Sequence, residues 1–490
     1  MRKALTAGVL SLSLLTGYAA ADVFDLVPGV LTRDKPTPPP AATTPSGPAP
    51  TLIPLPGTAA GEPLPIAVGT EAAEPTTAGL ERSLDAALAS PAFGGDIGVS
   101  IRDARTGQEL YARGAAEPRV VASTAKLLTA TAIGQTLDMS GHMTTSVVRS
   151  GDHELTVVAG GDTLLARGAG DPGQAAGHAG LGDLADQVVA ALAAAGTTSG
   201  ETTPGQGTAG KWTLRLDETY DAGDAVPPTW NPADIAAGYT QGVHMIGLAA
   251  QRPKPGEPSP ADPGGEVLGI LRDHLVKAGL TIDIVDSPEQ RQKPAPAGAA
   301  VLGQVTSAPY RDVLAEALDQ SDNALTENLA RQAAITAGGD GSFAANAAYV
   351  SATLKKLGFD LTGTKLIDTS GLSSGQSSTV ALLSAVVARA RAGKLPALAD
   401  VLARLPVAGL DGTLHDRYRE GPAASAAGHA RAKTGTLTGI SSLVGTTVDA
   451  DGRELDFVLV ADKVPAAQGT WAARLALDAV VADLTGCGCR

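Results

Sequence analysis

Residues 441–460, SSLVGTTVDADGRELDFVLV, decide how the carboxyl-terminal part of this chain folds. Strand-like runs extend from Ser441 to Val448 and from Glu454 to Val460, and Asp451-Gly452 lies between them. Asp-Gly between two such runs is a strong short-range signal for an antiparallel hairpin. A helical pattern from Trp471 to Leu484 follows. The sequence therefore predicts two paired strands and a closing helix.

A matching arrangement begins the globular part of the chain. Apolar residues between Leu80 and Leu88 recur every three or four positions, which indicates a helix. Alternating runs from Ile97 to Asp103 and from Gln108 to Arg113 flank a Thr106-Gly107 turn, as in a hairpin. Helix, hairpin, helical middle, hairpin and helix together predict an α+β fold: an antiparallel sheet flanked by helices, with an all-helical lobe beside it.

The pattern changes between residues 141 and 300. Short strand-like pieces, such as Glu154 to Val158 and Trp212 to Leu216, are separated there by glycine and proline. We interpret residues 141–300 as one or two inserted, mainly β domains. They would interrupt a main domain made of residues 79–140 and 301–486, with residues 487–490 as a tail.

The amino terminus has the features of an export signal. Arg2-Lys3 precedes an apolar run, and Ala19-Ala20-Ala21 offers a cleavage pattern of small residues. The run from Ala4 to Ala21 is also long enough to stay in a membrane as an uncleaved anchor. Either outcome for residues 1–21 places the rest of the chain outside the cytoplasm. Residues 22–78, rich in Pro, Ala and Thr, are expected to form an extended linker.

Composition excludes several partners and cofactors. The 490-residue chain carries a net charge of -14 and has no basic block beyond Arg2-Lys3, which argues against nucleic acid. Its seven histidines show no zinc-binding spacing, and Pro172 interrupts a dinucleotide-like G-x-G-x-x-G match at Gly168 to Gly173, so we predict no metal and no organic cofactor. The two cysteines, Cys487 and Cys489, could bind metal or form a local disulfide, but at a fraying terminus we expect them to be bystanders.

A candidate nucleophile lies in the stretch from Val121 to Leu128, VASTAKLL, at the start of a strongly helical segment. Residues three apart on a helix share a face, so the Ser123 hydroxyl and the Lys126 amine can meet. A serine needs a base to become a nucleophile, and a desolvated lysine has a lowered pKa that suits this role. Alone, this S-x-x-K pattern is a weak signal, because a capped helix with a solvated lysine has the same spacing.

Two further motifs follow in the chain. Ser321-Asp322-Asn323 leads into another amphipathic helix, where Ser321 could relay a proton and Asn323 could bind a substrate amide. Lys433-Thr434-Gly435-Thr436 begins the strand run before the second hairpin. Lys433 and Thr434 supply a charge and a hydroxyl for a terminal carboxylate, and Gly435 lets a substrate backbone lie close to the strand.

In this order the three motifs are jointly specific, and the chain resembles the serine penicillin-recognising enzymes. Ser321 lies 198 residues after Ser123, a gap too long for compact β-lactamases. The chain is similar to the low-molecular-mass class C penicillin-binding proteins, the D-alanyl-D-alanine carboxypeptidase/endopeptidase family, from about Leu80 to Leu484. Further stretches that resemble this family are Gly160 to Asp162, Asp368 to Ser373, Leu405 to Leu414 and Lys433 to Gly439.

The resemblance implies a role for each candidate residue. Ser123 would attack the terminal D-Ala-D-Ala bond of peptidoglycan stem peptides, with Lys126 as base, and β-lactams would acylate the same serine. Ser321 and Lys433 would protonate the leaving group, and Asn323, Thr434 and Gly435 would hold the peptide. Backbone N–H groups of Ser123 and Thr436 would form the oxyanion hole. The balance between carboxypeptidase and endopeptidase activity stays open.

Three rival interpretations fit parts of the sequence. A β-lactamase would need a group that activates the deacylating water, and no E-x-x-x-N element lies between the first two motifs. A non-catalytic β-lactam sensor or wall-binding protein would not need all three motifs intact. Residues 371–375 match a G-x-S-x-G elbow, with Asp411 and His415 after it, but the hairpin pattern does not supply the parallel sheet that this elbow requires.

Overall fold

The computed structural model describes residues 72–195, 210–220 and 223–490. The predicted export signal or anchor, residues 1–21, and most of the linker lie outside these residues, so both stay predictions. None of the helices in the described ranges has the length and apolar character needed to cross a membrane.

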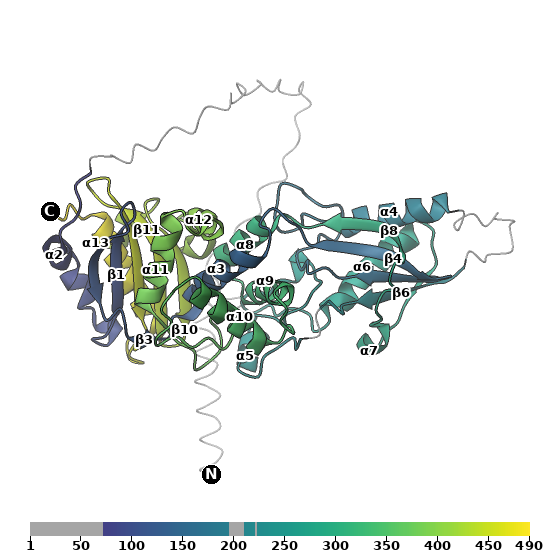
Figure 1. Ribbon diagram of the computed structural model, residues 1–490, viewed down its shortest axis with the longest axis horizontal. Helices are drawn as coiled ribbons and strands as arrows, with labels where there is room; N and C mark the ends of the chain where they lie inside the picture. The colour runs from purple at the N-terminus through teal and green to yellow at the C-terminus, as the bar shows by residue number, and fades with distance from the viewer. Residues whose placement is uncertain (1–71, 196–209, 221–222) are drawn as a thin grey trace, which may run out of the picture. The chain divides into compact units, whose positions relative to one another are not determined.

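The main sheet has five antiparallel strands in the order β10-β11-β12-β1-β2 (Figure 1). Both predicted hairpins are present, and β1 pairs with β12, with Val99 opposite Leu459. This pairing joins the two ends of the globular chain in one sheet. The strands are β1 (Gly98–Asp103), β2 (Glu109–Arg113), β10 (Arg431–Leu437), β11 (Ile440–Val448) and β12 (Glu454–Ala461).

Both faces of the main sheet are covered because side chains on a strand alternate between faces. Leu455, Phe457 and Leu459 pack in one core with α2 (Thr77–Leu88) and α13 (Gly469–Thr485), the predicted terminal helices. Val458 and Val460 belong to the core of the helical lobe on the other face. There α11 (Val380–Arg391) lies against β1 and β12.

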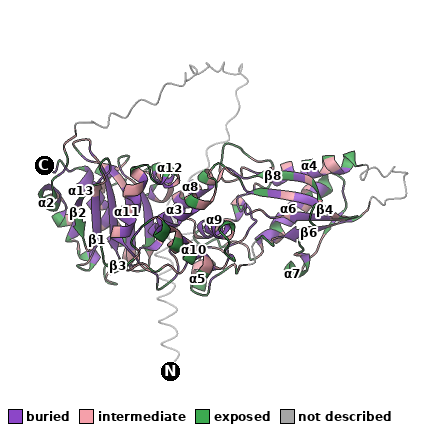
Figure 2. Ribbon diagram, viewed as in Figure 1, coloured by how far each residue is buried: buried purple, intermediate pink, exposed green. Residues whose placement is uncertain are grey.

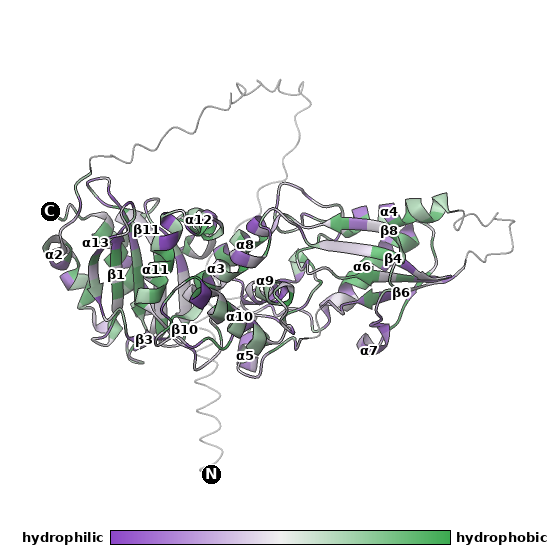
Figure 3. Cartoon of the chain, viewed as in Figure 1, coloured by the Kyte–Doolittle hydropathy of each residue, from purple (hydrophilic) through white to green (hydrophobic). Residues whose placement is uncertain are grey.

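The predicted helical lobe forms around α3 (Lys126–Thr136), which directly follows the 3-10 turn η2 (Ala122–Ala125). Eight of the eleven residues of α3 are buried, so the helix is enclosed by its neighbours (Figure 2). Figure 3 shows that hydrophobic residues predominate in two further helices of this lobe, α11 and α12. The other helices of this lobe are α8 (Tyr310–Asp319), α9 (Asn323–Thr336), α10 (Phe343–Lys356) and α12 (Pro396–Ala403).

A second sheet, ordered β7-β6-β5-β4-β8, lies between the first and second motifs in the chain. β5 pairs in parallel with β6, and β6 with β7. Parallel strands need crossover connections, which α4 (Leu181–Ala194) and α6 (Pro263–Lys277) provide. The strands are β4 (Thr144–Gly151), β5 (Glu154–Val158), β6 (Trp212–Asp217), β7 (Ile282–Ile284) and β8 (Ala300–Thr306).

This second sheet has its own apolar core, which α4 and α6 share with the strands. The described residues nevertheless belong to one compact unit, so the inserted domain at 141–300 stays a proposal about domain boundaries. Hereafter the segment 141–300 is called the insert. The short elements are β3 (Pro118–Arg119), β9 (Ser378–Thr379), α5 (Pro232–Ala236), α7 (Pro288–Arg291) and the 3-10 turns at Pro91–Phe93, Ala249–Gln251, Gly412–Leu414 and Pro422–Ala426.

The expectation that the two cysteines are bystanders at a fraying end is wrong. Cys487 and Cys489 are joined by a disulfide, and both are buried in the core beneath α2. The carbonyl of Cys489 accepts a hydrogen bond of 2.7 Å from the backbone N–H of Thr76. A side chain on Gly79 would place its Cβ 2.3 Å from that carbonyl oxygen. The tail is therefore part of the packing of α2.

A buried ion pair joins α13 to Arg417, which lies in the segment between α12 and β10. Arg417 donates from Nε to Asp478 at 3.0 Å, and both side chains are 3% exposed. We expect Asp478→Ala to lower the free energy of unfolding by about 3 kcal/mol, because it leaves a buried guanidinium without its partner. Denaturant unfolding of both proteins measures the difference.

The matched control is Leu475→Ala on the same helix, since the Leu475 side chain is 51% exposed and its removal should change little. Equal effects of the two substitutions would contradict a stabilising role for the ion pair.

Candidate active site

Ser123 and Lys126 meet because both lie on the turn that leads into α3. Residues three apart are eclipsed in a 3-10 helix, and Lys126 Nζ lies 2.9 Å from Ser123 Oγ. The same amine contacts Asn323 Oδ1 at 2.6 Å and the carbonyl oxygen of Ser370 at 2.7 Å. A neutral amine can donate to those two oxygens and still accept the proton of the Ser123 hydroxyl. This is the geometry of a nucleophile beside its base.

Burial sets the protonation of Lys126. The side chain is fully buried, and this desolvation lowers its pKa to about 8, although the negative charges of Asp368 and Glu327 oppose the shift. Burial likewise raises the pKa of Glu327 to about 7, and the neighbouring charge of Asp368 adds to the rise. A lysine with this pKa has a neutral fraction near physiological pH, as a general base requires.

The second motif occupies the turn between α8 and α9. Ser321 adopts a left-handed conformation with φ of 56°, and its hydroxyl accepts a hydrogen bond of 2.8 Å from Lys433 Nζ. Asp322 caps α9 by accepting from Leu325 N at 2.9 Å, and Asn323 is the first residue of that helix. The turn therefore presents Ser321 to Lys433 and Asn323 to Lys126.

The third motif lies on β10, the outer strand of the main sheet. Lys433 is fully buried, and desolvation together with the charge of Lys126 holds its pKa well below the usual range. Thr434 donates from Oγ1 to Thr413 at 3.0 Å, while Thr436 is exposed. β10 thus brings a lysine, a threonine hydroxyl and an outer strand edge to the two serines.

Gly435 is required where β10 passes the turn that carries Ser123. A Cβ at this position would lie 2.2 Å from Ser442 Oγ, 2.8 Å from the carbonyl oxygen of Val121 and 3.1 Å from Ser123 N. Such distances leave no room for a side chain. The absence of a side chain therefore lets the strand approach the backbone N–H of Ser123.

Sequence reasoning gave no role to Glu327 and Asp368. Glu327 accepts hydrogen bonds from the backbone N–H groups of Thr369 at 2.8 Å and Ser370 at 2.7 Å, which fixes the carbonyl that Lys126 contacts. Asp368 accepts from Gly371 N at 2.8 Å and from Trp230 Nε1 at 2.9 Å. The spacing of Asn323 and Glu327, one helical turn apart on one face, is the signal that could have suggested Glu327.

The rival G-x-S-x-G stretch has a different environment. Ser373 is 1% exposed, its N–H donates to Asp368 at 2.6 Å, and its hydroxyl pairs with Thr229. His415 is paired instead with Asp416 on the surface. Among the described residues, Ser373 therefore has hydrogen bonds to Asp368 and Thr229 and none to a histidine.

The site contains a half-buried serine hydroxyl within hydrogen-bond distance of a buried lysine, and a second serine–lysine pair beside it. This arrangement is that of an active-site serine hydrolase. The family model described as D-Ala-D-Ala carboxypeptidase 3 (S13) family matches residues 80–255 and 249–484. The chain belongs to this family, and it is a serine DD-peptidase, as its resemblance to the carboxypeptidase/endopeptidase family implied.

Individual relatives agree with the family. Carboxypeptidase DacB of Mycolicibacterium smegmatis is 35% identical over 446 residues, covering 89% of this chain and 90% of that protein. Carboxypeptidase Rv3627c of Mycobacterium tuberculosis is 33% identical, with 90% of each chain covered. In fold, the chain is similar to penicillin binding protein 4 (dacB) of Haemophilus influenzae, with a TM-score of 0.58, 20% identity and 83% and 98% of the two chains covered.

The pKa of Lys126 leads to a prediction about pH. The amine must be neutral to accept a proton, so the second-order rate of acylation should rise with pH and level off above about 8. Stopped-flow acylation with a chromogenic β-lactam, across a pH range that brackets this value, measures the rate. A rate that stays flat or falls through this range would show that Lys126 is not the base.

Gly435 leads to a prediction about space. We expect Gly435→Ala to slow acylation by on the order of ten-fold or more, because the added Cβ must displace Ser442 or the Ser123 turn. Gly452→Ala is the control for a glycine with nothing near the position of a Cβ, although its φ of 83° adds local strain. Equal acylation rates for the parent and Gly435→Ala would contradict the close approach.

Proposed function

We propose that Ser123 is the nucleophile and Lys126 its base in the cleavage of the terminal D-Ala-D-Ala bond of peptidoglycan stem peptides. The observation that supports this assignment is the 2.9 Å contact between Ser123 Oγ and a fully buried Lys126 amine. Ser123 Oγ attacks the carbonyl carbon of the penultimate D-alanine, and its proton passes to Lys126 Nζ. The peptide bond then breaks, D-alanine leaves and the rest of the peptide stays on Ser123 as an ester.

Ser321 and Lys433 are proposed to protonate the departing amine. The 2.8 Å contact between Lys433 Nζ and Ser321 Oγ supports a relay in which the hydroxyl proton goes to the amine and is replaced from the lysine. Backbone N–H groups of Ser123 and Thr436 would stabilise the oxyanion, which needs donors already in place. Water then hydrolyses the ester and restores the enzyme.

Substrate binding is assigned to the edge of β10 and to the start of α9. A peptide that adds to the edge of β10 would be held by main-chain hydrogen bonds, and Gly435 keeps that strand close to the backbone N–H of Ser123. The Thr434 hydroxyl, next to the Lys433 amine as a second hydrogen-bond donor, suits the terminal carboxylate. Asn323 Oδ1 accepts from Lys126, and its Nδ2, which donates to the carbonyl of Tyr239 at 3.3 Å, has a second hydrogen for a substrate carbonyl.

β-Lactams are proposed as covalent inhibitors at Ser123, since ring opening leaves the departing group tethered where water must approach. Penicillin binding protein 4 of Haemophilus influenzae has been solved in complex with a β-lactam, at a TM-score of 0.54 and 20% identity to this chain. Peptidoglycan lies outside the cytoplasm, which supports an extracytoplasmic site of action. Attachment to a membrane through residues 1–21, and endopeptidase activity on cross-links, are further parts of the proposal.

Intact mass spectrometry before and after penicillin, beside an assay for released D-alanine, tests the assignment. We expect the parent to gain the mass of one penicillin and to release D-alanine, and Ser123→Ala to do neither, because it lacks the proposed nucleophile. Ser373→Ala, which removes the serine of the rival motif, should keep both signals.

Retention of either signal by Ser123→Ala would assign the chemistry to another serine. A stable adduct on the parent without any D-alanine release would favour a sensor over an enzyme.

A further inference from the structure

The turn that presents Ser321 has an unfavourable backbone conformation. Ser321 N donates to Leu318 O at 3.2 Å and Asp322 N donates to Ala317 O at 2.9 Å, which is the Schellman pattern at the end of α8. The residue at the left-handed position of this pattern is usually glycine. A side chain there costs about 1–2 kcal/mol, so surrounding contacts must hold the turn in this state.

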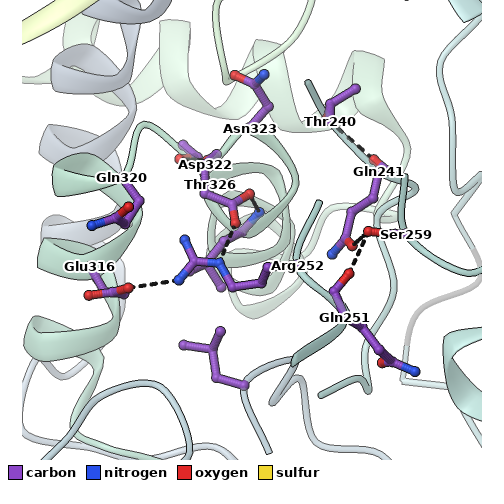
Figure 4. A network of polar contacts seen from close by, with 12 residues as sticks. Thr240, Gln241, Gln251, Arg252, Ser259, Glu316, Gln320, Asp322, Asn323 and Thr326 are labelled. Carbon is purple, nitrogen blue, oxygen red and sulfur yellow. Dashed lines mark hydrogen bonds and ion pairs between the residues drawn. The ribbon is translucent and has the colours of Figure 1, made fainter. Parts of the chain in front are cut away.

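Arg252 supplies such contacts from the insert. Its Nη1 lies 2.7 Å from Glu316 Oε1 in the last turn of α8, and its Nε lies 2.9 Å from Asp322 Oδ2 at the cap of α9 (Figure 4). The Arg252 side chain is 16% exposed and that of Asp322 is 9% exposed. One guanidinium therefore bridges the two helices on either side of Ser321.

The positive charge of Arg252 also offsets the two carboxylates on either side of the Ser321 turn. Glu316 lies at the carboxyl end of α8, where a negative side chain is unfavourable against the helix dipole. Without Arg252, two carboxylates would face each other across the turn that positions Ser321 against Lys433. Because the pairs are largely shielded from water, solvent would compensate only part of this loss.

The segment that carries Arg252 is anchored within the insert. Gln251 accepts from Leu248 N at 2.7 Å and donates to Glu266 of α6 at 3.1 Å. Ser259 Oγ donates to the carbonyl of Gln251 at 2.5 Å, as Figure 4 shows. The guanidinium is therefore held on a fixed backbone.

The insert contacts the motif at a second point. The carbonyl of Tyr239 accepts from Asn323 Nδ2 at 3.3 Å, opposite the side of the amide that binds Lys126. Tyr239, Arg252, Ser321 and Asn323 together line a cavity of about 490 Å³. The insert thus reaches both functional residues of the second motif.

We propose that Arg252 is a positioning residue: through Glu316 and Asp322 it holds Ser321 and Asn323 in their reactive places, so that the insert completes the active site. The inference rests on the proposed roles of Ser321 and Asn323. Arg252 itself touches neither Ser123 nor Lys126 in the hydrogen bonds of the structure. Its effect should therefore appear in the rate of the chemical step.

The test replaces Arg252 in the full-length protein with Met, which keeps the aliphatic stem and removes the charge. We expect the acylation rate with penicillin and kcat for D-alanine release to fall by on the order of ten-fold or more, with a smaller change in KM. Arg252→Lys should recover part of the rate, since one ammonium can pair with only one of the two carboxylates at full strength.

Arg215→Met is the matched control. Arg215 is a half-buried arginine of the same insert, 2.6 Å from Glu154 and 2.8 Å from the carbonyl of Gln290, and it lies on β6. Its loss should lower the melting temperature without slowing acylation. Glu316→Gln, a milder change at the same bridge, should slow acylation in the same direction, and combined with Arg252→Met it should add less than its separate effect.

The outcomes separate the two levels of the proposal. If the parent forms no adduct at Ser123, the proposed function fails. If the parent is acylated and Arg252→Met and Glu316→Gln react as fast as the parent, or slow no more than Arg215→Met, the positioning role of Arg252 is overturned while the function stands.

Discussion

The buried amine of Lys126 is the interaction on which the site depends. A charged amine in this position would have to give up its hydration, so burial shifts Lys126 toward the neutral form. The neutral amine is held by contacts with three oxygens. Those oxygens come from η2, from α9 and from the segment after Asp368. Three distant parts of the chain must therefore be correctly packed before Ser123 has a base.

This requirement explains much of the architecture around α3. The helix is enclosed by α9, α10 and α12, which removes water from Lys126, and Glu327 on α9 fixes the backbone of residues 369 and 370. The main sheet contributes from the other side, because Ser442 Oγ donates to the carbonyl of Val121 at 2.8 Å and so ties β11 to the turn before Ser123. The contacts that pack α9 and β11 against this region therefore also position Ser123 and Lys126.

The sequence predicted the features that depend on local pattern. The two hairpins, the terminal helices and β5 and β6 follow from alternation and turn residues, and the S-x-x-K spacing places Ser123 beside Lys126 on one turn. That Asn323 and Lys433 belong with them was inferred from motif order and resemblance, since 197 residues separate Lys126 from Asn323. Arg252 could not be found in this way, because its contact with Asp322, 70 residues away, depends on tertiary packing and no motif surrounds it.

Each functional serine lies at, or directly after, a backbone conformation that glycine adopts more easily. Ala122, directly before Ser123, has φ of 49°, and Ser321 has φ of 56°. The backbone of Ala122 fits because its neighbour Gly371 has no side chain: a Cβ on Gly371 would lie 2.1 Å from the Ala122 carbonyl oxygen. At Ser321 a glycine would relax the turn but remove the hydroxyl that faces Lys433. The conformation is therefore kept with a serine, and the strain is offset by contacts such as the Arg252 bridge. That is a physical reason for the insert to contact the second motif.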